Sequence, residues 1–506
     1  MSLNFKYIPL TFITDENEIK KQIRNTVILR YFFDKNESII KLKDCIEGTQ
    51  YGYNASALES GKNKFLRISD ITDGKVDWNS VPFCDCTDEK TYLLEPDDIL
   101  IARTGGTTGK SFMIKTPPAY AIYAGYLIRI RANDSILPEF LNIFLNSYIY
   151  WSQIVSMNEG EFRPSVNANK LKDLILPEVT EDEQNDIVKL SNGELLTEYQ
   201  NLNLQIEKAL TEYDNSKIII YEFTTQLSNV NELKQAILQE AIQGKLTEDW
   251  RAQNPDIEPA SELLKRIKSE KAQLIKDKKI KKEKPLPPIA EDEIPFELPE
   301  GWVWCYVSDI CDIYTGNSIN KAEKEAKYKI EQPGLNYIGT KDVEFNMLGI
   351  NYNTGVIIPE NEIYSSFKVA PKESVLICIE GGSSGKKIGI TDRNICFGNK
   401  LLASVPFLDF LGKYIYLYYN SSTFSFEFQG QSKGLRGGVS TNSFKQIKIP
   451  IPPEKELHEI INSVEDLLKK STELELEISK SEKYANMLMQ AVLKEAFESK
   501  QEVYES

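Results

Sequence analysis

A glycine-rich segment at residues 104–111 has the composition of a loop that could hold phosphate groups. Its sequence, Thr-Gly-Gly-Thr-Thr-Gly-Lys-Ser, ends in the Gly-Lys-Ser of nucleotide-binding phosphate loops. Two details argue against a nucleotide site: the first glycine of that pattern is replaced by Thr104, and a second copy at residues 380–387 ends without a hydroxyl group for magnesium. We predict a tight strand-turn-strand in both copies. Whether the turn contacts DNA phosphate through Lys110 and Lys386, or is purely structural, is left open.

Other candidate catalytic residues lack the neighbours that their chemistry requires. A methyltransferase acting on a base amino group needs an Asn/Asp-Pro-Pro-aromatic loop for the flipped base, and no Pro-Pro pair here is directly followed by an aromatic residue. Pro255-Asp256 with residues 277–279 loosely resembles a nuclease motif, but it lies in a lysine-rich segment without strands to direct its carboxylates. His458 is the only histidine, which removes most imidazole-based chemistry. The sequence therefore predicts no catalytic residues and no metal site.

Length and composition indicate a protein of several globular domains. A chain of 506 residues with 41% hydrophobic residues can form several cores. No run approaches the roughly 18 uncharged apolar residues of a membrane helix, and the first residues lack the apolar stretch of a signal peptide. The seven cysteines include no CxxC pair, so neither a disulfide framework nor a zinc site is indicated. We expect a cytoplasmic protein without a membrane partner.

The charge permits DNA binding but does not predict it. A formal charge of −15 argues at first against a nucleic-acid partner, because binding phosphate requires a basic face. Net charge, however, does not describe how charges are distributed, and acidic residues gather in the expected helical parts. The loops that match best between the two halves of the chain carry basic residues: Arg103, Lys110, Arg163, Lys386, Lys387, Lys433 and Arg436.

The two halves of the sequence repeat one another. Residues 162–172 align with 435–445, so that Val166 matches Val439 at a spacing of 273 positions. The glycine-rich segments match at a spacing of 276, and residues 233–241 match 488–496 at 255. This period is far longer than the roughly 20 to 50 residues of a solenoid repeat, so it indicates a duplicated domain. A duplicated unit suits a two-part target and two equivalent partners, because it approximates a two-fold axis within one chain.

Each half reads as a globular domain followed by a long helical region. We predict an α+β fold in which two globular domains are separated by two long antiparallel helices, with an internal pseudo-two-fold repeat. Apolar residues at alternating steps of three and four, from Leu195 to Ile237 and from Ile460 to Val492, indicate coiled-coil seams. The expected boundaries are 1–180 for the first domain, 181–245 for the first helical spacer, 246–297 for a Lys/Pro-rich connector, 298–453 for the second domain and 454–506 for the second spacer.

Two expectations concern the helical parts in detail. The first region has 56 residues from Pro177 to Leu233, whereas the second has 38 from Pro450 to Leu488, an excess of 18. Fully helical, this excess would add about 27 Å. Residues 229–232 resemble a capping box, so the sequence leaves open whether the first helix breaks near Asn229 or runs on. In the connector, residues 265–284 hold ten basic residues against three acids, which favours a helix with a charged face and a solvated connector over a nucleic-acid patch.

With this order of elements, the sequence resembles the specificity subunits of type I restriction-modification enzymes over essentially its whole length. The most specific pieces are residues 233–246 at the end of the first helical region and Leu-Pro-Glu-Gly-Trp at 298–302. Residues 379–389, Phe-Gly-Asn-Lys at 397–400, and Gly-Gly-Val before Ile-Pro-Ile-Pro-Pro at 449–453 also look like this family. The Glu-Gln pair that commonly follows Pro-Pro in the family is kept as Glu183-Gln184 but replaced by Glu456-Leu457.

The resemblance implies a non-catalytic subunit that directs partner enzymes. Each globular domain would be a target-recognition domain that reads one half of a bipartite double-stranded DNA sequence, and the helices would set the gap and dock two methyltransferase subunits. S-adenosylmethionine would bind to the methyltransferase partner. ATP and magnesium would bind to a restriction partner, which the family can include in two copies. This chain would hold no cofactor. The residues that we expect to contact DNA are Arg103, Lys110, Arg163, Lys386, Lys387 and Arg436. The residues expected to dock partners are Leu233, Ile237, Leu488 and Val492.

Two rival functions belong to other classes. A coiled-coil adaptor whose two domains bind protein would show no salt-dependent DNA affinity. A self-sufficient DNA methyltransferase would bind S-adenosylmethionine as an isolated chain, and the missing base-holding loop already counts against it.

Overall fold

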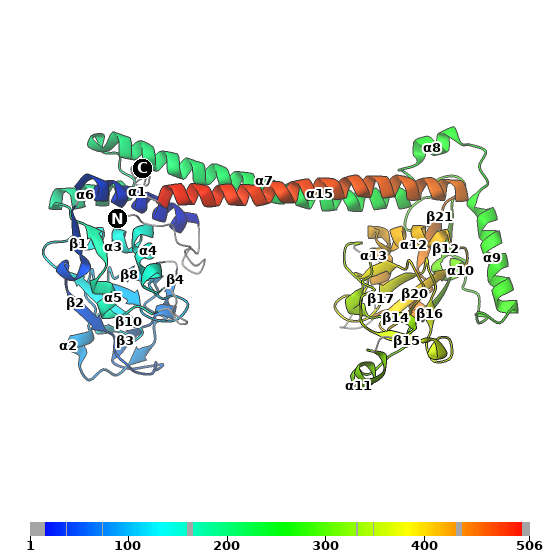
Figure 1. Cartoon of the computed structure of the whole chain (residues 1–506), viewed down its shortest axis with the longest axis horizontal. Coiled ribbons are helices and arrows are strands. Elements are labelled where there is room, and N and C mark those ends of the chain that lie inside the picture. Colours follow the sequence, from blue (N-terminus) through cyan, green and yellow to red (C-terminus); the bar gives the residue numbers. More distant parts are fainter. Residues whose placement is uncertain are drawn as a thin grey trace. The chain divides into compact units, whose positions relative to one another are not determined.

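The computed structural model describes residues 16–36, 38–72, 74–158, 165–329, 332–347, 349–431 and 438–497, and Figure 1 shows their helices and strands. The chain divides into two compact units. Unit 1 comprises residues 1–224 and 480–506, and unit 2 comprises residues 225–479. Each unit therefore holds one globular domain together with parts of both long helices.

The domain of unit 1 is built on two small sheets. The larger is antiparallel, in the order β2 (Ile46–Tyr51), β10 (Leu127–Ala132), β7 (Ile99–Ala102), β8 (Ser111–Met113). The smaller has the order β6 (Phe83–Cys84), β3 (Asn63–Leu66), β9 (Ala121–Tyr123), with β3 and β9 parallel. Two short antiparallel pairs complete it: β1 (Ile39–Lys41) with β11 (Ile175–Pro177), and β4 (Ile71–Thr72) with β5 (Lys75–Val76).

Alternation along the central strands divides the core of this domain into two layers. Successive side chains of a strand point to opposite faces. Ile128 and Ile130 of β10 are buried in one cluster, which also contains residues of the helices, whereas Leu127 and Leu100 belong to a second cluster with β9. The helices of unit 1 that precede the long helix are α1 (Glu16–Asn36), α2 (Glu89–Tyr92), α3 (Pro138–Leu145), α4 (Tyr148–Met157), α5 (Ala168–Lys172) and α6 (Glu181–Ser191).

The domain of unit 2 repeats this topology. Its larger sheet has the order β13 (Cys311–Thr315), β20 (Leu401–Pro406), β17 (Val375–Cys378), β18 (Ile388–Ile390). Its second sheet has the order β15 (Ile357–Pro359), β14 (Gly334–Ile338), β19 (Ile395–Phe397), β16 (Val369–Ala370), with β14 and β19 parallel. The closing pair is β12 (Val303–Tyr306) with β21 (Lys448–Ile451). The predicted α+β class and the internal duplication are thus confirmed.

The α-helices within the second domain are short. They are α10 (Val307–Ile310), α11 (Lys321–Glu323) with the π-helical turn η6 (Lys324–Tyr328), α12 (Leu411–Tyr419), α13 (Ser422–Gly430) and α14 (Thr441–Phe444). Among the helices of the described ranges, none is long and apolar enough to cross a membrane.

The two long helices are α7 (Gln200–Ile242, 43 residues) and α15 (Glu454–Phe497, 44 residues). In unit 1 they run antiparallel, because Lys208 pairs with Glu495 at 3.7 Å while Thr224 Oγ1 donates to Glu482 Oε1 at 3.3 Å. The sequence left open whether the first helix breaks near Asn229, and the structure shows that α7 continues through that residue.

The excess of the first helical region does not lengthen one helix. The chain ends α6 at Ser191 and starts α7 only at Gln200. Gly193, with a φ of +91°, donates its N–H to Leu190 and ends α6 in the manner of a helix C-terminal glycine. Leu195, which fitted the seam by spacing, lies in this interruption with 80% of its surface exposed. The first region is therefore not helical throughout, and the excess does not add the about 27 Å that full helicity would give.

The lysine-rich connector contains α8 (Glu248–Gln253) and α9 (Ala260–Lys276), and α9 packs on the second domain. Ala260, Leu263 and Ile267 are buried on its apolar face. Lys271, one turn after Ile267 on the same face, donates from Nζ to the Ser308 carbonyl at 2.7 Å. The predicted helix with a charged face is confirmed, but α9 is not a solvated connector.

Candidate nucleic-acid interface

Four segments meet at one end of the sheets in each domain. We call this set the loop cluster. In the first domain it comprises residues 52–62, 103–110, 123–126 and 165–168; in the second it comprises residues 316–329, 379–387, 397–400 and 438–440. The two motifs that recur in the sequence, the glycine-rich turn and the loop around Val166 or Val439, are therefore neighbours in space.

The same backbone hydrogen bonds hold both copies together. In the first domain the N–H of Arg103 donates to Tyr126 O at 3.0 Å, and the N–H of Val166 donates to Arg103 O at 2.8 Å. In the second, the N–H of Ile379 donates to Lys400 O and the N–H of Val439 to Ile379 O, both at 3.1 Å. The loop cluster is therefore held by the same backbone hydrogen bonds in both domains.

A glycine lets the first segment approach the third in each copy. A Cβ on Gly52 would lie 2.2 Å from the Ala124 carbonyl oxygen, and one on Gly316 would lie 2.0 Å from that of Phe397. These distances are far below contact, so only glycine fits at both positions.

The glycine-rich segments are strand-turn-strand connections, as predicted. They join β7 to β8 and β17 to β18, which pair antiparallel. Gly109 has a φ of +90° and Gly385 a φ of +73°, and a Cβ on either would come within 2.7 Å of an aromatic ring, that of Trp151 or Phe428. The second connection is one residue longer, because it runs over 379–387 rather than 103–110.

Arg103 is half-buried, and its guanidinium lies over the Tyr51 ring at 4.8 Å. The Tyr51 hydroxyl accepts the N–H of Ala168 at 3.1 Å, so the ring is itself held in the loop cluster. Arg103 Nε is buried and has no hydrogen-bond partner among the described residues. A guanidinium fixed on an aromatic face is pre-organised for planar contacts with bases or phosphate. The second domain has Ile379 at the matching position of the turn.

The predicted lysines differ in how available they are. Lys386 is exposed and Lys110 half-buried, and neither has a salt bridge within the described ranges. Lys387 instead donates to Thr340 O at 3.1 Å and lies over the Phe345 ring at 4.7 Å, so it is engaged within its own domain. Arg163 and Arg436 lie outside the described residues.

Sequence reasoning missed three side chains at the loop cluster. Tyr126 is 69% exposed, and Lys400 is exposed at the matching position of the second domain. Lys324 lies over the Tyr337 ring at 4.8 Å. Lys400 ends the Phe-Gly-Asn-Lys motif, so its place in that motif was a usable signal. Nothing in the sequence spacing pairs Lys324 with Tyr337.

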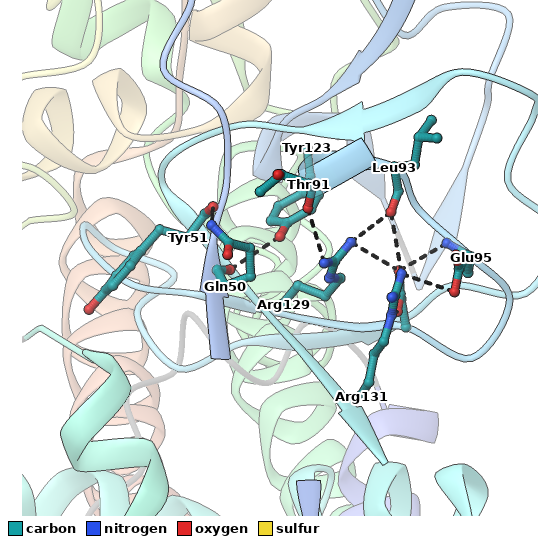
Figure 2. Close-up of polar contacts among 9 residues, drawn as sticks. Gln50, Tyr51, Thr91, Leu93, Glu95, Tyr123, Arg129 and Arg131 are labelled. Carbon is teal, nitrogen blue, oxygen red and sulfur yellow. Dashed lines mark hydrogen bonds and ion pairs between the residues drawn. The ribbon is translucent and has the colours of Figure 1, made fainter. Parts of the chain in front are cut away.

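The first domain also contains a largely buried polar network around Arg129 and Arg131 of β10, outside the loop cluster. Figure 2 shows Arg129 and Arg131 of β10 reaching the backbone at the end of α2: Arg129 Nη1 donates to Leu93 O at 2.6 Å and Nη2 to Thr91 O at 3.1 Å. Arg131 Nε donates to the buried Asp98 at 2.6 Å, and this bond raises the pKa of Arg131. The network is satisfied by its own members, so we assign it a structural role.

The second domain fills the same positions with apolar side chains. Strand register places Ala403 where the first domain has Arg129, since both lie opposite the second residue of the neighbouring strand, Leu376 or Leu100. The arginines are therefore a feature of one copy only.

Of the four residues expected to dock partners, two are accessible. Leu233 is 46% exposed and Leu488 is 49% exposed. Ile237 belongs to the core of unit 2, so it is not available to a partner. Val492 is half-buried and lines, with Arg30, a recess of about 450 Å³ in unit 1.

The family-like motifs at 233–246 and 298–302 meet at a buried junction in unit 2. Glu456, at 0% exposed, accepts hydrogen bonds from Thr247 Oγ1 at 2.7 Å, Arg251 Nη1 at 2.6 Å and Trp302 Nε1 at 2.9 Å. Gly244, with a φ of +69°, leaves no room for a Cβ beside Pro299 and Trp302. The glutamate of the altered Glu-Leu pair is thus the centre of the joint between the two motifs.

A family model matches the second domain and part of α15. Residues 299–481 match the family model of the type I restriction modification DNA specificity domain. Over about half of its length the chain is similar to type I specificity subunits. The EcoAI specificity subunit of Escherichia coli is 34% identical over 264 residues, which are 50% of this chain and 42% of that subunit. The EcoEI specificity subunit of the same species is 32% identical over 257 residues, 49% of this chain and 41% of that one. The chain thus spans less than half the length of either specificity subunit.

A solved structure extends the likeness in fold. A chain from the work on complex assembly and conformational transition of the type I R-M system aligns with a TM-score of 0.50 and 18% identity, covering 91% of this chain and 97% of that one. The family resemblance predicted from the sequence is confirmed. Among the described residues there is no group of three or more His, Cys, Asp or Glu that could hold a metal ion.

Proposed function

We propose that this chain is the DNA-binding specificity subunit of a type I restriction-modification complex. Each globular domain contacts one half of a bipartite double-stranded target, and the long helices set the gap and dock two methyltransferase subunits. The observation that carries the proposal is the repeated loop cluster, built by matching hydrogen bonds in two copies of one domain, the second of which matches a DNA specificity domain.

The proposal assigns the chemistry to partner subunits. The methyltransferase subunits bind S-adenosylmethionine and transfer the methyl group, and a restriction subunit, if one accompanies them, uses ATP and magnesium. This chain contributes orientation and sequence choice, and it acts in the cytoplasm with the DNA. Its net charge of −15 is compatible with this role, because the partner surfaces can supply much of the phosphate attraction.

Side chains of the loop cluster fit both tasks of a DNA reader. Contacts to phosphate set register, and contacts to base edges carry the sequence information. Lys386 and Lys400 are exposed cations suited to phosphate, whereas Arg103 on Tyr51 is suited to a base edge. Because Arg103 has no counterpart in the second domain, the two domains are expected to read different half-sites.

The test is methylome sequencing of cells that make this chain with a candidate methyltransferase subunit, compared with cells that make either protein alone. A new methylated bipartite motif that needs both proteins is the expected result. Absence of a motif while both proteins are soluble and associated, together with no salt-dependent DNA binding, would favour the protein-binding adaptor instead.

A further inference from the structure

Each glycine-rich turn contains three glycines, and the structure explains two of them. Gly105 and Gly109 have φ values of +87° and +90°, and Gly381 and Gly385 have φ values of +79° and +73°. Side chains other than glycine rarely adopt these values. The remaining glycine is Gly106 in the first domain and Gly382 in the second.

Nothing within the described chain requires glycine at these two positions. Thr108 donates its N–H to Gly105 O, and Ser384 donates its N–H to Gly381 O, so Gly106 and Gly382 occupy the second position of a four-residue turn. That position accepts most residues. Neither glycine has a positive φ, and a Cβ on either would have nothing within 4 Å. Both copies nevertheless keep glycine, which points to a constraint from outside the chain.

The backbone beside these glycines has free donors. The N–H groups of Gly106 and Thr107 donate to no described residue, and the same holds for Gly382 and Ser383. Successive unpaired N–H groups in a turn form an anion-binding concavity. Lys386, four residues after Gly382, is exposed and adds a positive charge to the same turn.

We infer that a DNA phosphate approaches the backbone of each turn at Gly106 and Gly382 and accepts hydrogen bonds from the adjacent N–H groups. A side chain at either position would hold the phosphate away from those groups, since a Cβ here points into the open space that the ligand occupies. The inference rests on the proposed function and specifies which backbone groups of the chain contact the DNA. Because both copies share the turn, it sets register on the DNA backbone and carries no sequence information.

The test compares the full chain with its Gly106→Ala, Gly382→Ala and double variants, using a fluorescent duplex of mixed sequence over a series of salt concentrations. We expect about a tenfold loss of affinity for each single variant, because each loses a hydrogen bond to a charged group. The slope of log affinity against log salt should stay close to the wild-type value, because neither substitution removes a lysine or an arginine. The Tm should stay unchanged or rise slightly, since alanine restricts the unfolded chain.

Gly48→Ala is the matched control. Gly48 lies in β2 outside the loop cluster, has no positive φ and has nothing within 4 Å of a built Cβ. Affinities of the turn variants equal to that of Gly48→Ala would overturn the inference while leaving the proposed function intact. A wild-type chain without salt-dependent binding would overturn the inference, and the proposed function would fall with it if the methylome also gained no bipartite motif.

Discussion

Glu456 is a fully buried carboxylate that accepts hydrogen bonds from three donors. Two of these donors are neutral, and the third is the charged guanidinium of Arg251. Replacing Glu456 with leucine leaves the Arg251 guanidinium, whose side chain is 20% exposed, without its ion-pair partner. It also leaves the Trp302 N–H without an acceptor. Removing one partner of a buried ion pair costs about 3–5 kcal/mol. We therefore expect Glu456→Leu to lower the free energy of unfolding by about that amount in urea denaturation of the full chain.

Glu454→Ala provides the comparison for this substitution. Glu454 begins the same helix and pairs with Arg266 at 2.6 Å, but both side chains are partly exposed. Exposed pairs contribute about 0–1 kcal/mol, so this variant should unfold close to the wild type. Equal losses in the two variants would contradict the role assigned to the buried junction.

Arg103 and Lys110 lie in the same turn, but replacing each should change DNA binding in a different way. If Arg103 reads a base edge, Arg103→Ala should cost about 1–3 kcal/mol of binding and relax the preference at one target position. Lys110→Ala should weaken binding to all sequences alike and lower the salt slope by about one. The measurement is competition binding against targets changed at one base pair. A loss of affinity without any change of preference in Arg103→Ala would reassign Arg103 to phosphate.

The variant Tyr51→Phe distinguishes the effect of the Tyr51 ring on Arg103 from the effect of the Tyr51 hydroxyl group. It keeps the ring beneath the Arg103 guanidinium and removes only the acceptor for the Ala168 N–H. DNA preference should therefore stay unchanged in Tyr51→Phe and change in Tyr51→Ala, because only alanine removes the ring.

At the scale of elements, α7 and α15 are two continuous helices of similar length. If they set the gap, inserting seven residues after Thr224 of α7 and after Ser479 of α15 should add about 10.5 Å of helix. This corresponds to about three base pairs at 3.4 Å each. The methylome of cells carrying this variant should show both half-sites unchanged and the gap longer by about three. An unchanged gap would show that the helices do not determine it.

The sequence predicted an element correctly where the local residue pattern is compatible with one common backbone conformation. Both glycine-rich turns were predicted, because glycine and strand residues at fixed spacing have one common solution. The end of α6 was missed although Gly193 marks it, because Leu195 continued the apolar spacing past the glycine and hid the interruption. The sequence could not decide whether the first helix breaks near Asn229, because it has a capping pattern there; in the structure Val230 is buried and α7 is continuous.

The contacts that build the loop cluster were less predictable. They join segments that are distant in sequence, such as Tyr126 with Arg103 and Asn317 with Phe397. Only strand register decides that Arg129 faces Leu93 in one domain while Ala403 takes its place in the other. One sequence carries no information about that register beyond alternation.

At the scale of the whole molecule, the duplication supplies defined points at which to exchange one domain for the other. Ile39 of β1 pairs with Pro177 of β11, and Trp304 of β12 pairs with Pro450 of β21, so the closing strands match in both copies. A chain in which residues 304–450 replace 39–177 keeps these closing pairs and both long helices. Since both domains would then read the same half-site, the methylome should show a symmetric bipartite motif with the wild-type gap.

The outcome of this exchange distinguishes reading by the domains from reading by the helices. A motif that keeps the original first half would place its recognition outside residues 39–177. Loss of all methylation is informative only if the exchanged chain still associates with the methyltransferase, because α1 and α6 pack on the helices that are replaced. Co-purification therefore accompanies the methylome. A symmetric motif from an associated complex would show that each copy of the loop cluster works as an independent reader and that the helices determine only the spacing.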